Sequence, residues 1–285
     1  MTGVQTCALP ICVGVVREFM VKHSKNDEAI SDQLDKEIKA ILRDKLGAEL
    51  VESVDPLYPD DPTVANMKYT FSDGFREILA HNVPEYFWQK TRDGKLEFEV
   101  PGWDVTSIDY AIALALGKAP LSPKINLRRI SASLDNSKSP FTVNKYLAER
   151  GDARVKDWAS WVSNAKWEND EHRATSVNAV GMKDLRARPE QISYLKMNQV
   201  MRLVVQKVMY ENKIDFFVNP ENTLPPPQIG RAGEPEVNNR PTASCCAQFT
   251  ALLSGPEIDV PAGYVDTVYE PQYVLDRKST RLNSS

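Results

Sequence analysis

Three polar residues follow a short apolar run in the C-terminal half of the chain. Residues 214–218 (IDFFV) are expected to form a core strand, and Asn219, Glu221 and Asn222 come after it. Because α/β proteins place ligands at the carboxyl ends of their strands, we predict that these three residues bind substrate. Asn side chains in a loop can equally bond their own backbone, and the sequence leaves both roles open.

Two cysteines and two carboxylates also have spacings that could support catalysis. Cys245 or Cys246 could act as a thiol nucleophile, although packing beside Phe249 on a helix face is the more ordinary role. Glu257 and Asp259 alternate on a predicted strand at residues 258–260, roughly 7 Å apart, which could suit an inverting glycosidase. A solvated strand end accounts for the same two residues more simply.

The sequence predicts neither a metal site nor a nucleotide site. His23, His81 and His172 are scattered along the chain, without the paired spacing of a zinc helix. The vicinal cysteines lack zinc-ligand spacing, and no glycine-rich phosphate-binding pattern occurs. We therefore expect no metal and no cofactor.

The two ends of the chain can be encoded by opposite strands of one oligonucleotide. Residues 276–285 (DRKSTRLNSS) have a codon choice, GATCGGAAGAGCACACGTCTGAACTCCAGT, whose reverse complement encodes residues 2–11 (TGVQTCALPI). This oligonucleotide resembles a short-read sequencing adapter, so we expect residues 1–11 and 276–285 to be adapter-derived. Residues 12–275 are then the protein, which we expect to be truncated at its N-terminal side.

Composition describes a soluble globular chain. The chain is 42% hydrophobic and 26% charged, and its longest fully apolar run, residues 111–116, is far short of a membrane span. Leaving out three basic residues and one acidic residue of the tail changes the net charge from −4 to −6. A negative charge disfavours a nucleic-acid partner.

Hydrophobic spacing predicts a strand–helix–strand unit near the start of the chain. Residues 13–17 suit a buried strand, and residues 48–54 suit a second one. Between them, Asn26 or Asp27 could cap a helix that ends at Gly47, with one apolar face made by Ile30, Leu34, Ile38, Ile41 and Leu42. Such a unit is typical of parallel strands covered by a helix.

Further elements are expected along the rest of the chain. Helical segments are predicted within residues 63–90, 104–117, 144–150 and 242–254, with a polar turn at 93–94, a loop at 176–184 and a long buried helix from Pro189. Since no linker-like stretch divides residues 12–275, we expect a single α/β domain.

The order of these segments resembles the amidase signature family. Four stretches carry the resemblance: GVVREFM with LGAELVESVDP, NKYLAERGDARVKDWASWV, IDFFVNPENTLPPPQIG and FTALLSGPEIDVPAGY. Asn219 stands where the family usually has Thr, and residues 257–259 replace a more apolar stretch. The resemblance implies an amidase-like α/β fold, with a mixed, largely parallel sheet covered by helices. It also implies hydrolysis of the carboxylic C–N bond of a small-molecule amide without a cofactor, and a role for Asn219 beside the cleft.

The catalytic residues that the resemblance implies are a nucleophilic serine, a second serine in a cis peptide and a lysine. No Gly/Ser-rich segment of that kind occurs here, so we expect these residues upstream of Val13 and an inactive fragment. The resemblance also allows a homodimer of the intact protein and a cytoplasmic location. Two alternatives remain: a non-catalytic binding or assembly protein of the same fold, and an unrelated α/β ligand-binding domain.

Overall fold

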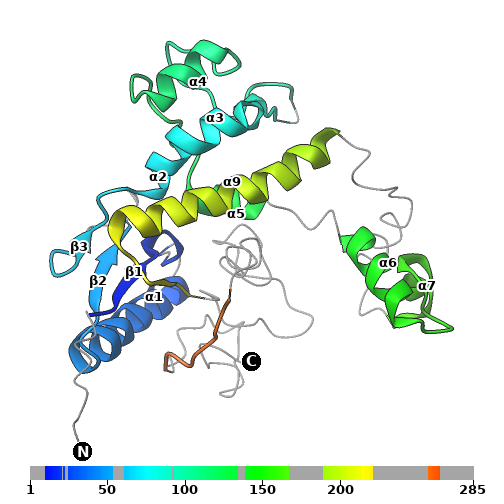
Figure 1. Cartoon of the computed structure of the whole chain (residues 1–285), viewed down its shortest axis with the longest axis horizontal. Coiled ribbons are helices and arrows are strands. Elements are labelled where there is room, and N and C mark those ends of the chain that lie inside the picture. The colour runs from blue at the N-terminus through cyan, green and yellow to red at the C-terminus, as the bar shows by residue number, and fades with distance from the viewer. Residues whose placement is uncertain are drawn as a thin grey trace, which may run out of the picture. The chain divides into compact units, whose positions relative to one another are not determined.

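The computed structural model describes residues 10–20, 22, 25–53, 61–91, 93–133, 139–166, 189–220 and 256–263 (Figure 1). These residues form an α/β fold that divides into two compact units. One unit is residues 133–197, and the other contains the rest of the chain, including the sheet. Among the described helices, none is long and apolar enough to cross a membrane.

Among the described residues, four parallel strands form a sheet in the order β3–β2–β1–β4. The strands are β1 (Cys12–Val15), β2 (Glu49–Glu52), β3 (Ala65–Asn66) and β4 (Phe216–Val218). In β1, Gly14 lies opposite Val51 of β2 and Phe217 of β4. A Cβ atom at Gly14 would lie 2.6 Å from the Phe217 ring, so this close approach requires glycine.

A long helix connects the first two strands and covers one face of the sheet (Figure 1). It begins as α1 (Lys25–Glu37) and continues with wider π-type turns over Ile38–Lys45. Gly47 ends it with a φ of 72°, and β2 follows. The predicted strand–helix–strand unit with parallel strands is therefore confirmed, although the helix begins one residue before the expected cap at Asn26.

The buried face of this helix agrees with the prediction at four of five positions. Ile30, Leu34 and Ile38 are buried, and Leu42 packs against the same core. The prediction for Ile41 is wrong, because its side chain is exposed. The π-type turns rotate less per residue than the α-helical spacing assumes, and this carries Ile41 off the apolar face.

The segment that follows is a strand before it is a helix. Ala65 and Asn66 pair with Val51 and Glu52, so the expected helical segment over 63–90 is wrong at its start. A strand of two residues has no periodicity to detect. The helix begins beyond it as α2 (Phe71–Gly74) and runs through π-type turns (Phe75–Leu79) into α3 (Ala80–Asn82).

Aromatic packing surrounds the next helix, α4 (Ile108–Ala115). A 3-10 turn over Pro84–Trp88 precedes it, and the predicted polar turn is present, with Gly94 at a φ of 82°. The rings of Tyr86 and Phe98 stack with their centroids 5.5 Å apart, and Phe87 meets Tyr110 edge-on at 6.0 Å. The helix α5 (Leu127–Ser133) follows α4 in the chain.

The long helix α9 (Pro189–Asn212) begins at the predicted proline. As predicted, it is buried along the stripe made by Met197, Val200, Met201, Val204 and Val208. It packs closely on α2, because a Cβ atom at Gly74 would lie 2.6 Å from Val204. The chain then turns at Lys213, which has a φ of 56°, and enters β4.

Two strand predictions near the C-terminal end are corrected. The strand at 214–218 exists as β4, but it lies at one side of the described sheet, and Phe216 is 43% exposed, so it is not a core strand. Residues 256–263 form no strand, and Ile258 is 86% exposed. Pro256 and Pro261 bracket that segment, and proline cannot donate to a strand ladder.

In the described part of the second unit lie α6 (Ser139–Arg150), α7 (Trp158–Asn164) and the start of α9. The predicted helix at 144–150 is therefore confirmed with an earlier start, and Gly151 ends it with a φ of 71°. Asp157 and Ser160 form a capping box that fixes the start of α7. The predicted loop at 176–184 and helix at 242–254 lie outside the described residues.

Candidate functional site

The carboxyl ends of β1, β2 and β4 meet at one edge of the sheet because the three strands are parallel. Arg17 and Glu18 follow β1, Ser53 follows β2, and Asn219 follows β4. The Val16 amide donates to the Val218 carbonyl at 3.0 Å, and this bond holds two of these strand ends together. This carboxyl edge is the candidate ligand site of the fold.

Arg17 is fully engaged by two carboxylates at this edge. Its Nε atom donates to Glu52 Oε2 at 2.8 Å, and a terminal nitrogen contacts the same oxygen at 2.5 Å. The other terminal nitrogen lies 2.8 Å from Asp35 Oδ1. Burial of the guanidinium lowers its pKa, but the charges of Asp35 and Glu52 outweigh this and raise it. Arg17 therefore holds α1 against the sheet.

The same ion network extends through Lys39. Its ammonium lies 2.5 Å from Asp35 Oδ2 and also pairs with Asp61. Burial raises the pKa of the Asp61 carboxyl, but bonds from Lys39 and from the hydroxyl and amide of Thr63 outweigh it and hold the pKa well below its usual value. The Asp61 amide also donates to Glu52 Oε1 at 2.9 Å. The network thus ties α1 to β2 and to the segment before β3.

A buried serine and glutamate lie beside this network. The Ser53 hydroxyl contacts Glu18 Oε2 and accepts a bond from the Arg17 amide at 3.1 Å. A hydroxyl held by a carboxylate is a pairing that can generate a nucleophile. Ser53 is fully buried, however, and Glu18 is nearly so. Because substrate cannot reach Ser53 in this arrangement, we assign this pair a structural role.

Of the three predicted substrate-binding residues, the structure describes Asn219. It lies at the carboxyl edge, half-buried, and its Nδ2 atom donates to the Pro220 carbonyl at 3.2 Å. That bond is the local backbone interaction that the sequence left open, and it uses one of the two amide hydrogens. Glu221 and Asn222 lie outside the described residues.

The other candidate residues that the structure describes do not form a site. Glu257 and Asp259 are exposed and are not on a strand, so the geometry expected for a glycosidase pair is absent from this described segment. Cys245, Cys246, His23 and His172 lie outside the described residues, and His81 is exposed at the end of α3. Within the described ranges, no group of three or more His, Cys, Asp or Glu side chains could hold a metal ion.

A surface cluster joins α9 to the helix that begins with α2. Glu77 accepts a bond from the Tyr69 hydroxyl at 2.9 Å and lies 2.6 Å from the Lys207 ammonium. The ammonium is 5.1 Å from the centroid of the Tyr69 ring. Burial, followed by the Glu77 carboxylate, raises the pKa of Tyr69. A phenol with a raised pKa is a poor base at neutral pH, so this cluster serves packing.

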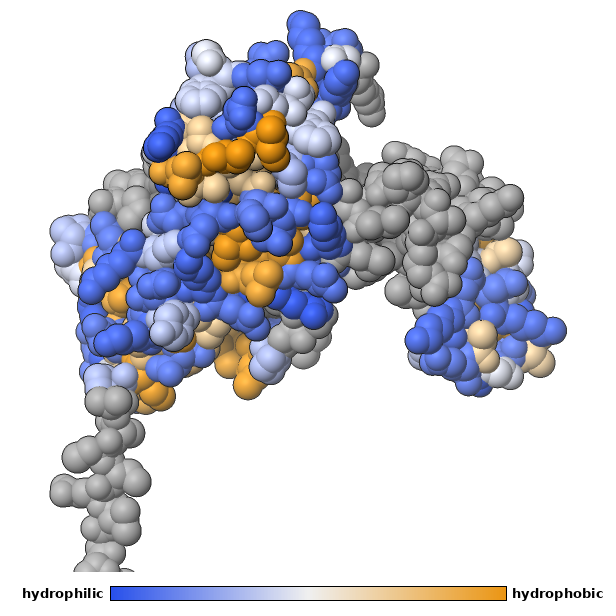
Figure 2. All heavy atoms as spheres, turned by 45° about the horizontal axis from the view of Figure 1, so that its top comes forward, coloured by the Kyte–Doolittle hydropathy of each residue, from blue (hydrophilic) through white to orange (hydrophobic). Residues whose placement is uncertain are grey.

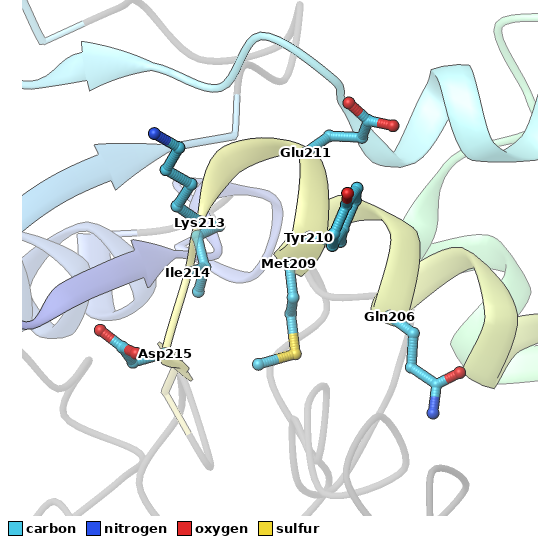
Figure 3. Close-up of a pocket in the computed structure, with 7 residues that line it drawn as sticks. All are labelled: Gln206, Met209, Tyr210, Glu211, Lys213, Ile214 and Asp215. Carbon is cyan, nitrogen blue, oxygen red and sulfur yellow. The ribbon is translucent and has the colours of Figure 1, made fainter.

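A cavity of about 740 Å³ lies at the opposite, amino edge of the sheet (Figure 3). It is lined by Gln206, Met209, Tyr210, Glu211, Lys213, Ile214 and Asp215. Figure 3 shows that the side chains of Met209 and Glu211 point to different sides of α9. The Asp215 carboxylate holds the start of β1, because its Oδ2 atom accepts a hydrogen bond from the Cys12 amide at 2.8 Å. Charged groups do not converge there as a catalytic site requires.

Sequence reasoning missed the ion network, although part of its signal was present. Arg17–Glu18 and Glu52–Ser53 each place charged and polar residues at the end of a predicted strand. Their pairing depends on the parallel register of β1 and β2, which places the two strand ends next to each other. Comparison with known proteins adds no relative: no family model, no curated protein and no solved structure matches the chain.

Proposed function

We propose that this chain is the scaffold and part of the substrate pocket of an amide hydrolase, which cleaves a carboxylic C–N bond. The observation that carries the proposal is the position of β4, which pairs directly with β1 although some 200 residues separate them. This pairing brings Asn219 to the carboxyl edge, where parallel sheets bind ligands. The amidase-like order of segments is the second support.

Asn219 is the residue proposed to contact the amide. Its side chain has one acceptor oxygen and two donor hydrogens, and the bond to Pro220 uses one of those hydrogens. The remaining oxygen and hydrogen complement the N–H and C=O groups of an amide substrate. Glu221 and Asn222, the next polar residues of the loop, are proposed to complete the contact.

The chemistry needs groups beyond those at the described edge. Amide hydrolysis requires a nucleophile, a base that takes its proton, and donors for the oxyanion that forms. Ser53 cannot serve as the nucleophile, because it is buried. In this proposal the lysine and the two serines that the amidase resemblance implies come from a segment before Val13. That lysine would deprotonate one serine, which would in turn accept the proton of the serine that attacks the carbonyl carbon.

Binding of a simple amide tests the proposed site. Benzamide titrated into the ¹⁵N-labelled chain should shift the backbone signals of Val218 and Asn219. Loss of one hydrogen bond in Asn219→Ala should weaken binding by roughly 2- to 12-fold. The control is Asn164→Ala in the second unit, which should bind as the unchanged chain does. Shifts confined to Met209–Asp215 would place the ligand at the amino edge and contradict the proposal.

A second candidate is an α/β domain that binds a small ligand without hydrolysing it. The observation that favours it is that residues 256–263 do not join the sheet, whereas the amidase-like order predicts a strand there. The two candidate functions can be distinguished with a longer chain that includes the segment before Val13. Hydrolysis of benzamide by that chain would favour the first candidate, and binding without hydrolysis would favour the second.

A further inference from the structure

The helix α4 is apolar on its outward face as well as on its buried face. Tyr110, Ala111 and Leu114 are buried against the aromatic core. On the other side, Ile108, Ile112 and Leu116 are 63%, 52% and 62% exposed. A surface helix ordinarily presents polar residues there, and a spacing of four places these three side chains in one row.

Other hydrophobic side chains are exposed in the same region of the molecule. Figure 2 shows hydrophobic side chains gathered on this face of the molecule, in the region of the helices α2 to α4. Exposed apolar side chains that gather on one surface are typical of a site that binds another molecule. Burying it removes apolar area from water, which is favourable by about 25 cal/mol per Å².

The charges at the two ends of the apolar row indicate which partner would complement it. Asp109 is exposed in the first turn of α4, and Lys118 is exposed immediately after Gly117 ends the helix. An identical helix running in the opposite direction would place Ile112 against its own copy and Ile108 against Leu116 of that copy. In this arrangement the first turn of one helix, which carries Asp109, would face the end of the other helix, after which Lys118 follows. A lysine side chain is long enough to reach a carboxylate placed there.

We infer that a second copy of this chain docks on α4, with the two α4 helices antiparallel about a twofold axis near Ile112. The self-complementary order of charges is the argument for a copy and for this direction. An interface of two short helices is smaller than the roughly 800 Å² per partner of stable complexes. The dimer is therefore weak, and it should form only at high protein concentration and low salt.

Sedimentation velocity over a range of protein concentrations tests the apolar row. The unchanged chain should pass from monomer to dimer as concentration rises, and Ile112→Glu should remain monomeric. The matched control is Leu203→Glu, because Leu203 is 49% exposed in the middle of α9. Circular dichroism confirms that each variant folds. A monomeric unchanged chain at about 1 mM, or equal effects of the two substitutions, would overturn the inference.

A charge exchange tests the antiparallel direction separately. Lys118→Glu should weaken the dimer about tenfold, because the introduced carboxylate would face Asp109 of the copy. The double variant Asp109→Lys with Lys118→Glu should restore the original dissociation constant. If the double variant is as weak as the single one, the two charges do not meet and the antiparallel arrangement is wrong.

Discussion

The Asn212 side chain forms hydrogen bonds with both the amide and the carbonyl of Tyr69. Its Nδ2 atom donates to the Tyr69 carbonyl at 2.7 Å, and its Oδ1 atom accepts from the Tyr69 amide at 3.4 Å. The same oxygen accepts from the Lys68 amide at 2.7 Å, and Nδ2 also donates to the Val208 carbonyl at 2.8 Å. One side chain at the end of α9 thus fixes the link between β3 and α2.

Removing this side chain should destabilise the fold. Asn212→Ala leaves the exposed Lys68 amide and the part-buried Tyr69 amide without their acceptor, and a lost hydrogen bond of this kind costs about 0.5–1.5 kcal/mol. Urea unfolding followed by circular dichroism measures the loss. Asn212→Asp keeps the acceptor oxygen and should lose less. Asn164→Ala in the second unit serves as the control, and a loss as large as that of Asn212→Ala would contradict this assignment.

The ion network predicts a non-additive pair of substitutions. Arg17→Met leaves the buried Glu52 carboxylate without its main partner, which should cost about 3–5 kcal/mol of unfolding free energy. Adding Glu52→Gln removes the unpaired charge, so the double variant should be more stable than Arg17→Met alone. Urea unfolding of the single and double variants measures this coupling. Simple addition of the two losses would show that the network does not act as a unit.

The contacts of Asp61 should make the unfolding free energy fall in acid. Its pKa is lowered in the folded chain, so its contribution is present above its unfolded pKa of 3.8 and is lost as pH falls through the folded value. Between pH 6 and 2 the unchanged chain should therefore lose more unfolding free energy than Asp61→Asn does, with most of the difference below pH 3.8. Equal losses in urea titrations across this range would show that Asp61 is not held ionised by Lys39 and Thr63.

Replacing Lys213 by glycine should stabilise the fold. The Lys213 φ of 56° is in the left-handed region, where a side chain is strained and glycine is not. The Ile214 amide donates to the Met209 carbonyl at 2.8 Å, which is the bond that closes a helix at a glycine-type cap. Lys213→Gly should raise the unfolding free energy by about 0.5–1 kcal/mol, and Lys213→Ala should not. Thermal unfolding compares the two, and equal melting temperatures would contradict the strain.

Local patterns predicted the parts of this fold that depend on neighbours in sequence. The buried strand β1, the helix before Gly47 and the start of α9 at Pro189 are of this kind. The wrong predictions depend on partners elsewhere in the chain. Residues 258–260 are as apolar as a strand, but a strand forms only when another strand pairs with it. Ile41 differs because π-type turns changed the periodicity.

The candidate site was predictable only in part, for the same reason. The position of Asn219 at the carboxyl end of a strand was predictable from the apolar run before it, and its role in binding stays a prediction. Sequence patterns did not identify the bonds of Arg17 with Glu52 and Asp35, because those residues are far apart in sequence and meet only in the folded sheet. Spacing along the chain carries no information about such contacts.

The most direct test of the proposed function is to read the source DNA upstream of Val13, over about 200 codons. The proposal predicts an in-frame lysine followed by a Gly/Ser-rich segment with two serines, which would provide the nucleophile and base that the carboxyl edge of this sheet requires. An in-frame start codon immediately before Val13, or an upstream region without these residues, would contradict it and favour a binding domain.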